Sequence, residues 1–208
     1  MESGLKVKKN IEDIIFDSMG VKISINDRYH HNSSYASAPS IIKNGILSLH
    51  DLHRNGIVNF SDSQLKIFDD TDSHVNGSDR VSLAVVGLDD LYKDEVEFNP
   101  FKPANVDFIV SSNIKASRNS THYGNEFLSY GSIKNDMLRS VDVRILEYLD
   151  RLSKLETTNV NDLINIYESL RNIAIALKES KLDIPLREMS KGNSLDIDKI
   201  IEMPKLVK

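Results

Sequence analysis

The sequence predicts an α+β fold, because β-type segments occupy its middle and helical periodicity dominates its last third. Four segments rich in β-branched and aromatic residues, separated by loops, lie between residues 81 and 145. The stretch from Leu163 to Leu177 instead repeats apolar residues at helical spacing. Strands and long helices that are grouped separately along a chain are typical of an α+β protein.

Composition limits the classes of function. The 208 residues suit one domain with an appendage, and apolar and charged fractions of 40% and 27% are those of a folded protein. A net charge of -5 argues against binding nucleic acid mainly by phosphate neutralisation. The absence of cysteine excludes disulfides, thiolate zinc sites and cysteine nucleophiles. With no apolar run long enough to span a bilayer and no secretory h-region, we expect a cytoplasmic protein.

The first elements are a helix and a strand. Apolar residues between Ile11 and Met19 recur at helical spacing and stop at Gly20, a common helix end. Val21–Ile25 then alternates apolar and polar residues, as a half-buried strand does, and a turn at Asn26-Asp27 leads into Arg28–His31. We expect a strand pair or one bulged strand here.

Two short helices follow in series. Ser37 can cap a helix that has Pro39 in its first turn and ends at Asn44-Gly45. Ser48 can cap a second helix, Leu49 to Arg54, which ends at the similar signal Asn55-Gly56.

The middle of the chain is expected to build the sheet. Residues 61–79 are rich in Asp and Ser and read as a surface loop. Together with the N-terminal strands, the four later segments predict a sheet of about six strands: Val81–Val86, Val106–Val110, Glu126–Tyr130 and Val141–Ile145.

The remainder of the chain is predicted to be mainly helical. Leucines from Leu146 to Leu155 and apolar residues from Leu163 to Leu177 mark two amphipathic helices, and Ile197 to Ile201 a short third one. We therefore divide the chain into a domain at residues 1–150 and a C-terminal helical extension at residues 151–208. The apolar stripes of the extension either complete the core or bind a protein partner.

Three short segments carry a resemblance to a known family. Tyr29–Ser33 is followed by Ser40–Leu47, which contains Ile41-x-x-x-Gly45 and an apolar pair, and later by Ser120–Leu128, a loop that delivers Glu126 to the start of a strand. In this order they resemble the histidine-containing ADP-ribosyltransferase superfamily over roughly residues 25 to 145. The resemblance implies a split β-sheet with short flanking helices, and NAD as a substrate.

The resemblance also implies roles for individual residues. Glu126 would hydrogen-bond the nicotinamide ribose and stabilise the positive charge that develops as the glycosidic bond breaks. His30 would hydrogen-bond a ribose or the nicotinamide end of NAD. Thr121 and Tyr123 would lie in a target-recognition loop. Residues implied to bind the cofactor are His30, Tyr29, Arg28, Ser82 and Tyr35.

The same residue types also have ordinary explanations. A strand serine such as Ser82 commonly faces water, and Arg28 is more readily a surface charge than a phosphate clamp. Tyr35 is equally at home in a core. A lone Glu126 would most often be a solvated charge at a strand edge. A site is therefore indicated by the order of these residues along the chain and not by any one of them alone.

One departure from the family pattern concerns the acceptor. Branches that modify arginine carry a glutamate two residues before the catalytic one, and here that position is Gly124. Arginine is therefore disfavoured as the acceptor, and the sequence does not identify the group that is modified. We expect a transferase that modifies a macromolecule, with a protein target favoured over nucleic acid, in the role of a toxin or effector. The alternative is a non-catalytic nucleotide- or protein-binding module of the same fold with a regulatory or anti-defence role.

Metal chemistry has little support. His50-x-x-His53 has a spacing that two helical ligands can use, but no third ligand is linked to it by pattern. We predict no metal site.

Overall fold

The computed structural model of the protein describes residues 29–59, 61, 79–85, 106–118, 126–146, 160–189 and 193–204. Their strands form one eight-stranded sheet in the order β4-β5-β2-β1-β3-β6-β7-β8, and with the helices they confirm a mixed α+β fold. The strands are β1 (Tyr29–Ser33), β2 (Ser82–Val85), β3 (Val106–Val110), β4 (Ala116–Arg118), β5 (Glu126–Ser129), β6 (Leu138–Val143), β7 (Leu186–Glu188) and β8 (Asn193–Ser194).

The sheet is mostly antiparallel, and β1 lies near its middle. β1 pairs with β2 on one side and along its full length with β3 on the other. The exception is β7, which runs parallel to β6. Such a pair needs a long crossover connection, and the chain provides one between Val143 and Leu186.

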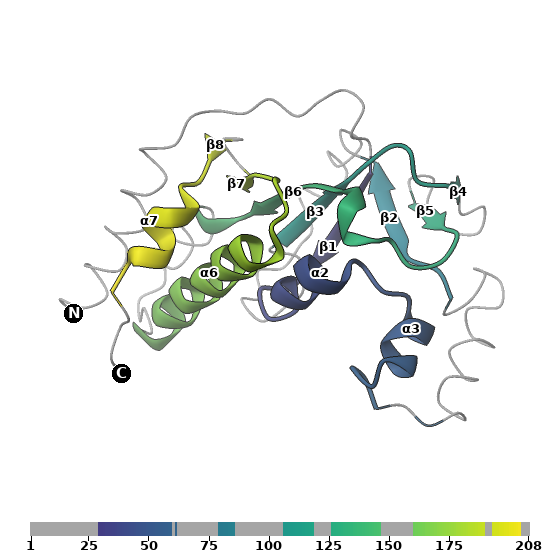
Figure 1. The fold of residues 1–208 in the computed structure, drawn as a ribbon, viewed down its shortest axis with the longest axis horizontal. Coiled ribbons are helices and arrows are strands. Elements are labelled where there is room, and N and C mark those ends of the chain that lie inside the picture. The colour runs from purple at the N-terminus through teal and green to yellow at the C-terminus, as the bar shows by residue number, and fades with distance from the viewer. Residues whose placement is uncertain are drawn as a thin grey trace.

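Four helices are described: α2 (Ala38–Asn44), α3 (Leu49–Arg54), α6 (Val160–Ser180) and α7 (Ile197–Glu202), with a 3₁₀ turn η2 at Asn135–Met137. Figure 1 shows α2 and α6 side by side, with α7 next to α6, whereas α3 projects away from this group. None of the described helices has the combination of length and hydrophobicity needed to cross a membrane.

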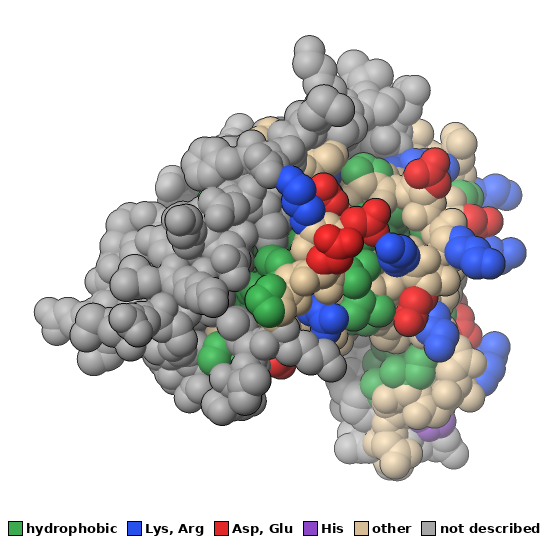
Figure 2. Space-filling view, turned by 60° about the vertical axis from the view of Figure 1, so that its left-hand side comes forward, with side chains coloured by type: hydrophobic (Ala, Val, Ile, Leu, Met, Phe, Trp, Pro, Cys, Tyr) green, Lys and Arg blue, Asp and Glu red, His purple; other side chains and the backbone are tan. Residues whose placement is uncertain are grey.

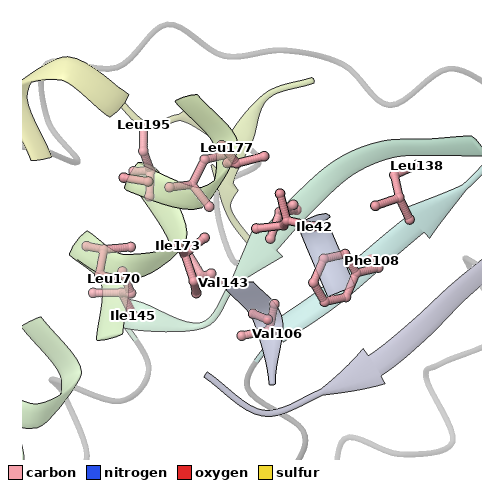
Figure 3. Close-up of a cluster of buried hydrophobic side chains, with 14 of the residues drawn as sticks. Ile42, Val106, Phe108, Leu138, Val143, Ile145, Leu170, Ile173, Leu177 and Leu195 are labelled. Carbon is pink, nitrogen blue, oxygen red and sulfur yellow. The ribbon is translucent and has the colours of Figure 1, made fainter. Parts of the chain in front are cut away.

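The core lies between one face of the sheet and the α2–α6 layer. Ile42 of α2 and Leu170, Ile173 and Leu177 of α6 meet Phe108 of β3 in a single buried cluster (Figure 3). Each side chain of this size stabilises the fold by about 1.5–3 kcal/mol when it is fully buried. From Ile166 to Leu177 the apolar stripe of α6 is thus buried inside this chain, and the described part of residues 151–208 shares the core and the sheet of the preceding residues.

The two faces of the sheet differ in chemistry. Side chains alternate between faces along a strand, so Val106, Phe108 and Val110 point into the core cluster while Asp107 and Ile109 belong to the opposite face. All five are buried. We call the face that carries Asp107 and Ile109 the polar face, because several buried polar side chains lie along it.

Gly45 fixes α2 against the end of the sheet. Its φ of +83° and ψ of -179° fall in a region that is essentially restricted to glycine, and its N–H donates to the Ile41 carbonyl. A Cβ at this position would overlap the backbone oxygen of Ile133. Ile46, the residue after Gly45, forms a β-bridge with Ile133. This bridge brings the backbone of Gly45 so close to that of Ile133 that only glycine fits at the end of the Ile41-x-x-x-Gly45 motif.

Several predicted elements match the described ones. The second short helix, Leu49–Arg54, has its predicted bounds, and Ser48 caps it by accepting a hydrogen bond from the Asp51 N–H at 3.2 Å. The prediction of about six strands was too low, since the described sheet has eight. The predicted helix at Ile11–Met19, the strand at Val21–Ile25 and nearly all of the helix at Leu146–Leu155 lie outside the described residues.

Candidate functional site

Cross-strand register places His30 and Glu126 in one row of the sheet. Ala84 of β2 pairs with His30 of β1 on one side and with Glu126 of β5 on the other. Directly paired positions of antiparallel strands belong to the same face, here the polar face. With strands about 4.8 Å apart, the backbones of His30 and Glu126 are separated by about 10 Å, with an alanine between them.

Ser82 lies on the same face, two residues before Ala84. It pairs with Leu128 of β5, and its side chain is exposed. Its carbonyl accepts a hydrogen bond of 3.0 Å from Nδ1 of His31, a residue whose position belongs to the core face. Burial lowers the pKa of His31, and this hydrogen bond opposes the shift. His31 therefore holds β1 to β2 beside the row that contains His30.

His30 is itself buried and faces a carboxylate. Its side chain is 6% exposed, and its Nδ1 lies 3.6 Å from Oδ2 of Asp107 on β3. The other oxygen of Asp107 accepts a hydrogen bond from the side-chain amide of Asn32. Arg144, just after β6, brings a guanidinium nitrogen to 4.0 Å from the same Oδ2 that faces His30.

A second carboxylate extends the polar face toward β7. Asp142 of β6 is paired with Asp107 of β3. Its carboxylate accepts two hydrogen bonds from Arg187, one from Nε at 2.8 Å and one from a terminal guanidinium nitrogen. Ser140 donates to Asp142 at 2.8 Å and accepts from Arg187 at 2.8 Å. Burial raises the pKa of Asp142, and the Arg187 hydrogen bonds oppose that rise. The pair is thus a buried ion pair with additional hydrogen bonds.

Other residues predicted for the site lie elsewhere. Tyr29 belongs to the core face, where its ring packs at 5.4 Å from that of Phe127, and Tyr35 is half-buried against the same core. Arg28, Thr121 and Tyr123 lie outside the described residues, as does the side chain of Glu126. Register therefore brings together His30, Ser82 and the backbone position of Glu126, and it places Tyr29 on the opposite face.

A cleft of about 410 Å³ lies at a different place, between α3 and the ends of β2 and β5. It is lined by Arg54 and Asp51 of α3 together with Arg80 and Tyr130, and the Arg80 guanidinium lies 4.9 Å from the centre of the Tyr130 ring. His30 and Ala84 are not among its described lining residues. No group of three or more potential metal ligands occurs in the part of the chain that the structure describes.

Sequence reasoning missed the polar network around His30. Asn32, Asp107, Asp142 and Arg187 were not singled out, although each sits in or beside a recognisable segment. The available signal was an aspartate, Asp107, inside the otherwise apolar run Val106–Val110, because a carboxylate there must be paired if it is buried.

The sequence matches no protein-family model, and comparisons with curated proteins and with solved structures also found no match.

Proposed function

We propose that the protein is an NAD-dependent mono-ADP-ribosyltransferase that modifies a macromolecule, with His30 and Glu126 in one site. The observation that supports this most is the shared row, in which both residues pair with Ala84 from opposite sides. Two residues that are 96 positions apart in the sequence are thereby separated by a single strand. Alanine has the smallest side chain that a chiral residue can have, so Ala84 itself would not obstruct a ligand over the row.

The reaction needs few groups from the protein. The bond between C1′ of the ribose and the nicotinamide nitrogen breaks, and its electron pair leaves with nicotinamide. The acceptor then bonds to C1′ and loses a proton, or water does so and gives free ADP-ribose. A fixed carboxylate at Glu126 would stabilise the positive charge on the ribose, and His30 would orient the ribose by a hydrogen bond.

The proposal includes a finer fold assignment, an ADP-ribosyltransferase-like sheet. It is supported by the arrangement of the elements that carry the resemblance. The glutamate strand β5, the middle strand β2 and the histidine strand β1 are neighbours in the sheet, and the helix α2 that follows β1 ends at Gly45. In the described residues β1 and β3 are paired along their whole length, so a split of the sheet at that point is not part of the proposal.

For the acceptor we propose a protein. The net charge of -5 is unfavourable for binding a polyanion. On the surface seen in Figure 2, acidic and basic side chains of the described residues are interspersed, with no broad basic patch in that view. Gly124, in place of a second acidic residue before Glu126, makes arginine a poor candidate for the modified side chain.

The rival is a binding module without catalysis, and the burial of His30 favours it. At 5% exposure, the His30 ring can meet a ribose only after atoms that cover it move aside. The transferase proposal therefore includes a conformational step before NAD cleavage, whereas a module that binds a protein through another surface requires no such step.

The two functions are separated by incubating the protein with NAD and measuring nicotinamide release, alone and with cell lysate. The NAD used carries a label in its adenylate half, which stays with the ADP-ribose. A transferase releases nicotinamide and transfers this label to a protein in the lysate. His30→Ala should lower the release by about tenfold or more, because it removes a hydrogen bond that orients the ribose. Neither release nor labelled product in any lysate would leave the binding module as the better account.

A further inference from the structure

We propose that Asp107 is a positioning residue for His30, and that it fixes which ring nitrogen of His30 carries the proton in the reaction proposed above. This inference rests on the proposed function for its catalytic consequence, but its structural part concerns only the two side chains. Through Asp107, the Nδ1–H of His30 would be held within the sheet, and the ring would present its Nε2 edge to the ligand once NAD displaces the atoms that cover it.

The Asp107 carboxylate lies beside Nδ1 of His30. Its Oδ2 lies 3.6 Å from Nδ1 of His30, in ion-pair range, and both side chains are less than 10% exposed. Loose contacts of this kind in a ligand-free site commonly tighten when the ligand binds. A buried histidine has few orientations available, so the nitrogen that faces the carboxylate is determined by packing.

The carboxylate is itself held in place. The amide nitrogen of Asn32 donates to Oδ1 of Asp107, and the two residues are directly paired between β1 and β3. His30 is two residues before Asn32 on the same strand and the same face. Asp107 thus reaches His30 diagonally across the ladder while Asn32 fixes its rotation, a fixed support of the kind that catalytic side chains need.

The neighbouring carboxylate shows that the two aspartates of this face have different tasks. Asp142 receives two hydrogen bonds from Arg187 and one from Ser140, which is the full partner set of a structural ion pair. Asp107 instead directs one oxygen to Asn32 and the other toward His30, with Arg144 at 4.0 Å. Asp142 therefore provides a matched control: it is a buried aspartate of the same face that does not orient the histidine.

The consequence for chemistry follows from the donor and acceptor properties of imidazole. An ionised carboxylate can only accept, so it selects the tautomer that carries hydrogen on Nδ1, and Nε2 is then the atom that would accept from a ribose hydroxyl in the NAD-bound state. In Asp107→Asn, the side-chain oxygen would stay with the Asn32 amide and the new NH2 group would face His30. Nδ1 must then accept, the proton moves to Nε2, and the acceptor for the ribose is lost.

The first test is a ¹⁵N NMR measurement of the neutral His30 ring in the full chain, which identifies the ring nitrogen that carries the proton. We expect the proton on Nδ1 in the wild type and on Nε2 in Asp107→Asn. Asp142→Asn should leave the His30 tautomer unchanged even where it lowers thermal stability. A wild-type ring protonated on Nε2 overturns the inference, and that measurement requires no variant to fold.

The second test is the steady-state rate of nicotinamide release. Asp107→Asn should lower kcat by about a hundredfold with a smaller change in KM, as expected when a reacting group is misplaced by about 1 Å. Asp142→Asn, assayed where it is folded, should keep kcat within about threefold. A wild-type kcat in Asp107→Asn contradicts the positioning role. If the wild type itself releases no nicotinamide, the proposed function fails, and the tautomer measurement still decides whether Asp107 orients His30.

Discussion

Glu126→Gln is expected to lower the rate of nicotinamide release by about a hundredfold or more, the typical effect of removing a group that stabilises transition-state charge. Glutamine keeps the size of the side chain and its ability to accept one hydrogen bond. It loses the negative charge that would face the ribose as its bond to nicotinamide breaks. The effect should therefore fall on kcat more than on KM, because the charge develops only in the transition state.

The matched control is Glu168→Gln, on the exposed side of α6. It removes the same charge from the same chain, far along the sequence from β5, and should leave nicotinamide release unchanged. A Glu126→Gln protein that turns over NAD at the wild-type rate would contradict the assignment of Glu126, and with it the proposed chemistry of the row.

Arg187→Met is expected to destabilise the protein by about 3–5 kcal/mol at neutral pH, since it leaves the buried carboxylate of Asp142 without its cation. Urea unfolding measures the change. The double variant Arg187→Met with Asp142→Leu should recover most of the lost stability, because no uncompensated charge remains. A single variant within about 1 kcal/mol of the wild type would show that the ion pair is not needed for stability.

The loss in Arg187→Met should depend on pH in a defined direction. Burial already raises the pKa of Asp142 above its ordinary value of 3.8, so the folded protein binds this proton more tightly than the unfolded chain does. The contribution of Asp142 to stability is therefore least favourable at a pH where its carboxylate is ionised in both the folded and the unfolded protein. Removing Arg187 raises the pKa further, so the destabilisation should be largest near neutral pH and shrink as the solution is acidified through the raised pKa. A loss of equal size at acid and neutral pH would contradict this cause.

Local signals in the sequence located much of the fold. Ser48 and Asn55-Gly56 bound α3 at the predicted residues, because capping and stop signals act within one turn of a helix. The segment Val106–Val110 was recognised from its residue types alone. In contrast, β4, β7 and β8 have only two or three residues each, too few for any period to appear, and they exist because neighbouring strands pair with them.

The candidate site depended on long-range information that a sequence does not carry. Residue order suggested His30 and Glu126, but only the register of β1, β2 and β5 puts both opposite Ala84. Asp142 alternates with apolar residues and by that pattern would face water, and Asp107 lies in a largely apolar strand, yet both carboxylates are buried. Their burial follows from partners on other strands, His30 for Asp107 and Arg187 for Asp142.

Binding of NAD over the row can be measured through the methyl group of Ala84. In Glu126→Gln protein with ¹³C-labelled alanine methyl groups, turnover is suppressed and NAD can be added to saturation. If NAD binds between His30 and position 126, the Ala84 methyl resonance must shift, while that of Ala174, buried in the core on α6, stays in place. Saturation of the protein with NAD while the Ala84 resonance does not move would contradict the account, because the ligand would then lie somewhere other than over this row.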